Sequence, residues 1–119
     1  MSNKIRFESY VAEAAVAANL IVRYGAADGG CTVATAATDA LIGAADGLAK
    51  TTGEMVDVAI GEIGEVRLGG TVTRGAWLTA NASSKAIATT TTGHQVIGRA
   101  EQAGVADDVI RYRVAPGQL

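Results

Sequence analysis

The chain carries an internal repeat, and this repeat limits the folds open to it more than any other feature. Three short apolar segments of the first half recur in the same order in the second half: Ile21, Val33 and Ile42 correspond to Trp77, Ile87 and Ile97. The spacings are 56 (77 − 21), 54 (87 − 33) and 55 (97 − 42) residues. A steady period is typical of a duplicated structural unit. Two copies are too few for a solenoid, so the repeat predicts one compact domain with two related halves.

Most of the chain has the pattern of short strands separated by glycine-rich turns. Val, Ile and Thr favour strands because their branched side chains suit a pleated surface. Fifteen glycines provide many turns. The predicted strands share short apolar or alternating patterns: 20–24, 31–36, 41–45, 55–60, 61–68, 77–79, 86–89, 95–101 and 109–114. The sequence therefore predicts a mainly β fold, either a compact single-domain β-barrel or a β-sandwich.

An N-terminal strand precedes the repeat. Lys4–Val11 alternates, with Ile5, Phe7, Ser9 and Val11 on one face, which is typical of a half-buried strand. The alanine-rich segment 13–19 is short and has no amphipathic pattern. It predicts an extended connector, with a single helical turn as the alternative.

The repeat divides the chain into three consecutive parts. Gly69-Gly70 is the clearest midpoint. We expect an N-terminal arm or strand at 1–15, a first β unit at 16–68 and a second β unit at 69–119, all within a single domain.

Composition and charge exclude several kinds of partner. The net charge is −2 and the isoelectric point is about 5.3, whereas nucleic-acid-binding domains usually carry a basic surface. No stretch approaches the roughly 20 apolar residues that cross a membrane. The N-terminus also lacks the long apolar segment of a secretory signal. We therefore expect neither nucleic acid nor membrane as a direct partner.

The sequence offers no set of residues that would carry out catalysis. His94 is the single histidine and lies in a polar loop, so no Ser–His–Asp or Cys–His arrangement can be built on it. Cys31 is the single cysteine, and we expect it to be a small apolar core residue. The carboxylates are scattered over turns, without the spacing of a metal site. We expect no enzymatic activity, no cofactor and no metal.

Several segments, in their order along the chain, resemble those of a known family. They are Gly69–Thr79, Ala40–Gly43 followed by Gly53–Val58, Val96–Ala100 and Val114–Gly117. Together they are similar to segments of the small capsid cement or decoration proteins of tailed bacteriophages. The resemblance runs from about Phe7 to Gly117 and depends on the order of the segments, because no single one is diagnostic.

This resemblance implies a function in the virion. Proteins of this family are β-barrel-like subunits on the outer surface of the capsid, where they stabilise the head by bridging subunits of the major capsid protein. They commonly bind as trimers near local three-fold axes, although dimers are known. The implied partners are the major capsid protein and further copies of the chain, with a trimer favoured over a dimer.

Two sites follow as hypotheses. The N-terminal strand, through Ile5, Phe7 and Tyr10, is the candidate capsid-binding segment, because a strand can add to an exposed sheet edge and place side chains in pockets. Alternatively, this strand completes its own barrel. Trp77 is the candidate anchor of an oligomer interface, with a place in the core as the alternative.

Two other functions stay open. A lipoyl or biotinyl carrier domain also has duplicated β halves, but it carries its lysine at a tight hairpin between the halves. Lys50 lies within the first repeat and lacks the flanking acidic or Met residues. The other alternative is a tail-associated structural domain of a virion, which the sequence does not distinguish from a head protein.

Overall fold

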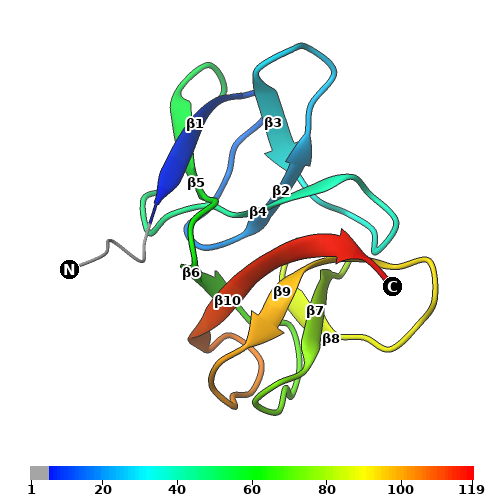
Figure 1. Ribbon diagram of the computed structural model, residues 1–119. Coiled ribbons are helices and arrows are strands. Elements are labelled where there is room, and N and C mark those ends of the chain that lie inside the picture. The colour runs from blue at the N-terminus through cyan, green and yellow to red at the C-terminus, as the bar shows by residue number, and fades with distance from the viewer. Residues whose placement is uncertain (1–5) are drawn as a thin grey trace.

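The structure is a computed structural model that describes residues 6–119. These residues form ten β-strands in two five-stranded sheets (Figure 1). The first sheet contains β1 (Phe7–Ala12), β2 (Ile21–Tyr24), β3 (Gly30–Val33), β4 (Leu41–Ala44) and β5 (Met55–Ala59). The second contains β6 (Ile63–Arg67), β7 (Trp77–Ala80), β8 (Ala86–Ala88), β9 (Gln95–Ala100) and β10 (Val109–Gln118). The expected mainly β fold is confirmed, with two sheets packed in a sandwich-like arrangement.

Each sheet curls until its two edge strands meet at one isolated bridge. The first sheet has the order β4-β2-β3-β1-β5, and a bridge between Ala45 and Val58 brings the β4 and β5 edges together. The second has the order β6-β10-β9-β7-β8, and a bridge between Leu68 and Ala86 brings the β6 and β8 edges together. We number the five strands of each unit in chain order. Read as a circle from its first strand, each curled sheet then has the same order: first, fifth, fourth, second and third strand.

The register of the strands repeats together with their order. Two matched sets of pairs are Phe7–Ala59 with Ile63–Arg113, and Val22–Gly43 with Leu78–Gly98. Each second-unit residue lies 54–56 positions after its first-unit counterpart (113 − 59 = 54, 98 − 43 = 55, 63 − 7 = 56). We call such positions equivalent. The predicted duplication is therefore confirmed as a duplication of backbone pairing, except that Val33 is equivalent to Ala88 and not, as predicted, to Ile87.

Two strands lie in a different unit from the one the sequence suggested. β6 was expected to end the first unit, but it pairs with β10 and is the first strand of the second sheet. β1 was expected outside the repeat, but it is the equivalent of β6 and pairs with β5 and β3. The chain passes between the sheets at 60–62, before Gly69-Gly70. These two strands were hard to match because their side chains have different surroundings in the two units.

Each curled sheet surrounds an apolar core, and the two cores use equivalent positions. The first core consists of Ala12, Val16, Val22, Cys31, Ile42, Ala45, Val56 and Val58. The equivalent residues of the second unit are Leu68, Val72, Leu78, Ala86, Ile97, Ala100, Ile110 and Tyr112, all within the second core cluster. Leu replaces Ala and Tyr replaces Val in the second unit, so its core contains more apolar volume.

The second core continues into the first unit across the region where the two units pack against each other, which we call the seam. Ile21, Ala34, Leu41 and Ala44 of the first unit pack in the same cluster as the second-unit core. The Ala44 amide donates a hydrogen bond of 3.1 Å to the buried hydroxyl of Tyr112. Burial raises the pKa of Tyr112 to about 12, so the hydroxyl stays neutral at physiological pH. The second core therefore extends across the seam, whereas the first unit also keeps a separate core of its own.

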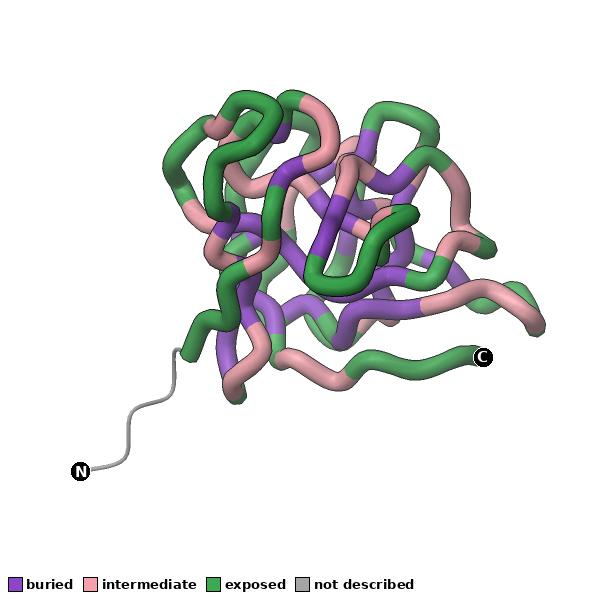
Figure 2. Tube along the Cα trace, turned by 90° about the horizontal axis from the view of Figure 1, so that it is seen from above, coloured by how far each residue is buried: buried purple, intermediate pink, exposed green. Residues whose placement is uncertain are grey.

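The connecting segments lie at the periphery (Figure 2). Figure 2 shows buried stretches through the middle of the molecule and exposed stretches in the loops and near the C-terminus. The connector 13–19 forms no helix; it bends at 13–14 and turns at 18–19, and between them Val16 is buried and forms a bridge with Lys50. Its equivalent, Val72, is buried and forms a bridge with Gly104 in the same way.

Candidate binding surface

Several exposed apolar side chains among the described residues are available for contact with another molecule. Within 6–119, no three His, Cys, Asp or Glu side chains are grouped so that they could hold a metal ion. The same part of the chain has no helix of the length and apolar character needed to span a membrane. The exposed large apolar side chains are concentrated in the first unit: Phe7, Val11, Tyr24, Leu48 and Met55. Their distribution points to the first unit as a binding surface.

Three of these side chains lie on the outer face of β1 and β5, where the hydrogen-bonded pair Ser9–Asp57 separates Phe7 from Val11 and Met55. Phe7 and Val11 lie on the same side of β1, and Met55 is directly opposite Val11 on β5. All three are between 42 and 50 % exposed. We call Phe7, Val11 and Met55 the β1 stripe. The expectation of a half-buried strand assigned the apolar face to the interior, but the structure buries Ala12 and half-buries Tyr10, on the opposite face.

The first half of β1 has an open backbone edge. The Val11 amide donates to the Gly29 carbonyl, so alternate residues of β1 direct their main-chain groups towards β3. The β1–β3 register includes only Val11 and Ala12. Among the described residues, Phe7 and Ser9 therefore have no backbone partner on this side. An incoming strand could pair with them.

The structure shows that this strand pairs within its own sheet, one of the two alternatives that the sequence left open. β1 completes its own sheet through five residue pairs with β5, from Phe7 to Val11. It still keeps one edge free at its first residues. Ile5, the third proposed contact residue, lies outside the described residues.

Tyr10 does not belong to the β1 stripe. It lies on the opposite face of β1, where it packs against the first core and meets the Tyr24 ring edge-on at a centroid distance of 6.3 Å. Burial raises the pKa of Tyr10, and Tyr24 and Glu8 add to the shift. Tyr24 is 54 % exposed. The two tyrosines cover the end of the first core, and we call this place the tyrosine end.

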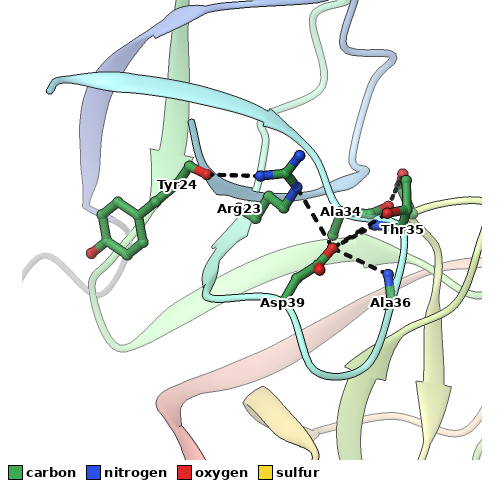
Figure 3. Close-up of polar contacts among 7 residues, drawn as sticks. Arg23, Tyr24, Ala34, Thr35, Ala36 and Asp39 are labelled. Carbon is green, nitrogen blue, oxygen red and sulfur yellow. Dashed lines mark hydrogen bonds and ion pairs between the residues drawn. The ribbon is translucent and has the colours of Figure 1, made fainter. Parts of the chain in front are cut away.

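A polar network holds the backbone beside Tyr24 (Figure 3). Arg23 pairs with Asp39 at 3.6 Å and donates to the Tyr24 carbonyl at 3.2 Å. The same Asp39 oxygen accepts from the amides of Thr35 and Ala36. Figure 3 shows the Tyr24 ring pointing away from this network. The network fixes the main chain and leaves the ring available for contact.

A small cavity lies at the seam beside Phe7. It has a volume of about 180 Å³, and Phe7, Ala44, Ala59 and Gly64 are among the residues that line it. Asp46 and Glu65 contribute carboxylates to its wall. The cavity is large enough for one side chain of a partner.

Trp77 lies half-buried on the outer face of the second unit. It belongs to neither core cluster as a buried member. The Arg99 guanidinium lies over the Trp77 ring, 4.3 Å from the centroid, a cation–π arrangement. Arg99 pairs with Trp77 on β7 and with Arg113 on β10. We call Trp77, Arg99 and Arg113 the Trp–Arg face. The sequence did not indicate that Arg99 lies beside Trp77, because cross-strand neighbours depend on register.

The remaining candidate residues have structural surroundings. His94 Nδ1 lies 2.7 Å from the Thr89 hydroxyl oxygen, within hydrogen-bond distance. Cys31 is fully buried in the first core, and burial raises the pKa of its thiol. Lys50 lies half-buried in a backbone bridge with Val16 rather than at a hairpin tip between the units.

Comparison with known proteins identifies a similar fold. No protein-family profile matches the chain, and no curated protein matches it in sequence. Among solved structures, the chain is similar to the N base of the head fibre protein gp8.5 of bacteriophage phi29. The TM-score is 0.69 at 16 % sequence identity, and the match covers 97 % of this chain and 98 % of that one. The two chains therefore share a fold over nearly their whole length.

Proposed function

We propose that this protein is a structural component of a phage virion, a decoration protein that binds the outer surface of the head. The observation that carries this proposal is the end-to-end fold similarity to the N base of a phage head fibre protein. The order of sequence segments that resembles phage cement proteins supports the same class. Neither observation depends on the other, since one compares backbones and the other compares sequence.

The proposed partner is the major capsid protein, which the decoration protein bridges from one subunit to the next. The open edge of β1 offers main-chain groups to a capsid strand, and the β1 stripe offers apolar contact beside it. Many copies, each with a modest contact, add up to a large resistance of the shell to disruption. The role is one of binding, without catalysis or a cofactor, and trimers are the favoured form.

The first experiment is a binding assay with capsids. Purified protein is mixed with expanded, undecorated heads and with unexpanded proheads, then pelleted and quantified. We expect saturable binding to expanded heads together with a rise in their disruption temperature. Absence of binding to either shell would contradict the proposal and favour a tail-associated domain or a carrier domain, the latter being detectable as a mass increase on Lys50.

A matched pair of variants tests the proposed contact. Phe7→Asp places a charge in the β1 stripe, whereas Leu48→Asp places the same charge at another exposed apolar side chain, outside the stripe. Binding should fall at least about tenfold for Phe7→Asp, because an unpaired charge in a contact costs more than 1.4 kcal/mol. Leu48→Asp should bind as the unsubstituted protein does. Equal binding by both variants would move the contact away from β1.

A further inference from the structure

The two units meet through different surfaces, although they share one backbone plan. The first unit contributes the side of β2 and β4 that contains Ile21 and Ala44. The second unit contributes the end of its core, where Val66 and Ala80 are almost fully buried. The equivalent strands β4 and β9 also approach one another, but these apolar contacts join different surfaces of the two units, so the arrangement is mainly head-to-tail.

A head-to-tail pair leaves one unused surface on each unit. In the first unit, the positions equivalent to Val66 and Ala80 are Tyr10 and Tyr24, which form the tyrosine end. This end is exposed at Tyr24 instead of being covered by a second unit. Glu8 lies beside it, at the position equivalent to Gly64.

On the second unit, the unused surface is the Trp–Arg face. Trp77 is equivalent to Ile21, Arg99 to Ala44 and Arg113 to Ala59. Ile21, Ala44 and Ala59 are buried at the seam. Of the equivalent residues in the second unit, Arg99 and Arg113 are exposed and Trp77 is half-buried.

The contacts at the seam indicate which residues would meet if the two unused surfaces, on two separate copies of the chain, packed in the same way. At the seam, a Cβ added to Gly64 would lie 2.8 Å from the Ala59 Cβ, so these two positions are direct neighbours. The equivalent pair is Glu8 and Arg113, which have opposite charge.

The apolar contacts at the seam can be mapped to equivalent residues in the same way. Ile21 and Ala44 share a cluster with Val66 and Ala80, so Trp77 and Arg99 would meet Tyr10 and Tyr24. Tyr, Trp and Arg are the residues most enriched where interfaces carry their binding energy, and Arg stacks on aromatic faces.

We propose that the tyrosine end of one copy binds the Trp–Arg face of a second copy, so that the chain associates with itself head-to-tail. The side chains on both surfaces are larger than those at the seam, so the copies lie farther apart than the two units do. A head-to-tail contact closes into a ring or continues as a filament. The inference concerns the free protein and does not require binding to a capsid.

Charge reversal distinguishes this contact from other ways to associate. Glu8→Arg and Arg113→Glu are prepared as separate proteins and studied by sedimentation velocity over a range of concentrations. Each alone places like charges in the contact, so we expect self-association to weaken at least about tenfold. In a mixture, opposite charges meet wherever copies of the two variants alternate, so the mixture should associate more strongly than either variant alone. Leu48→Arg is the control for an exposed charge elsewhere.

Cysteine cross-linking gives a second measurement that is independent of affinity. Glu8→Cys protein and Arg113→Cys protein are mixed under mild oxidation, and the buried Cys31 is replaced by Ala, the residue at its equivalent position 86. The head-to-tail contact predicts mixed disulfides in excess over either homodisulfide. An unsubstituted protein that stays monomeric, or homodisulfides in excess, would overturn the proposal. Head binding is measured separately, so it can succeed or fail on its own.

Discussion

The turn between the second and third strands is held differently in the two units. In the first unit, the Glu13 carboxylate, beyond the end of β1, accepts from the amides of Ala26 and Ala27. In the second unit, the side chain of Asn81, within the turn itself, accepts from the amides of Ser83 and Lys85. Backbone amides of the turn are thus satisfied from outside in one unit and from within in the other.

In each unit, a glycine occupies the position at which the other unit has its polar side chain. Glu13 is equivalent to Gly69, and Gly25 is equivalent to Asn81. A Cβ at Gly25 would overlap the Glu13 carboxylate, and a Cβ at Gly69 would overlap the Asn81 amide. Each unit has room for one of the two polar side chains. In the two equivalent turns, the polar side chain that binds backbone amides and the glycine that leaves room for it have therefore exchanged positions.

Gly98 offers the strongest test of how alike the two units are. It has φ of 150°, a conformation almost restricted to glycine, and an added Cβ would overlap the Arg113 carbonyl oxygen. Gly98→Ala should therefore lower the free energy of unfolding by about 3 kcal/mol or more. Urea unfolding at pH 7 measures the loss. The equivalent change, Gly43→Ala, has only the close approach of 2.8 Å to the Ala59 carbonyl oxygen and should cost less. An equal loss would contradict this difference.

The hydrogen bond across the seam tests the coupling between the units. Tyr112→Phe removes the hydroxyl that accepts from the Ala44 amide, and leaves that amide buried without a partner. Stability should fall by about 1–3 kcal/mol. Thermal and urea unfolding should remain a single transition, because the apolar cluster still spans both units. Tyr24→Phe, which removes an exposed hydroxyl, should leave stability unchanged; a similar loss there would show that the bond at the seam is not the cause.

The sequence revealed the repeat where equivalent residues have similar surroundings. Ile42-Gly43 and Ile97-Gly98 face the core at the same place in each unit, so their types match. Period-two patterns and glycine turns then located nine of the ten strands within a few residues, and the tenth, β1, was predicted as a strand but not as part of the repeat. Residue patterns within single segments were therefore sufficient to locate the strands and most of the repeat.

The binding surfaces were harder to predict, because they depend on how the units pack. Phe7 is exposed while its equivalent Ile63 is 6 % exposed, although both are large apolar residues in the first strand of a unit. Tyr10 was grouped with Phe7, yet alternation along the strand places it on the other face. Arg99 was missed because its stacking on Trp77 follows from the β7–β9 register.

The Glu13 turn predicts a dependence on pH that the Asn81 turn lacks. Hydrogen bonds from the Ala27 and Ala26 amides lower the pKa of Glu13 below its ordinary value of 4.5. Its contribution to stability is therefore complete above pH 4.5 and is lost as the pH falls through the lowered pKa. Glu13→Gln should destabilise the protein at pH 7, and the difference from the unsubstituted protein should shrink towards zero in acid. Asn81→Ala should show a loss of about 1 kcal/mol at both pH values, and a constant loss for Glu13→Gln would exclude this account.

The smallest effect on stability is expected at Phe7, where the comparison bears most directly on function. Because Phe7 is 48 % exposed, Phe7→Ala should change the free energy of unfolding by only about 0.5 kcal/mol. Ile63→Ala, at the equivalent buried position, should cost about 2–5 kcal/mol. Urea unfolding of both variants gives the contrast, and the head-binding assay gives the consequence. An apolar side chain kept on the surface with little benefit to stability requires another role, and reduced head binding by a fully stable Phe7→Ala protein would provide it. If Phe7→Ala instead unfolds as readily as Ile63→Ala, the Phe7 side chain stabilises the fold. That result would contradict the proposal that the β1 stripe is kept on the surface to bind the capsid.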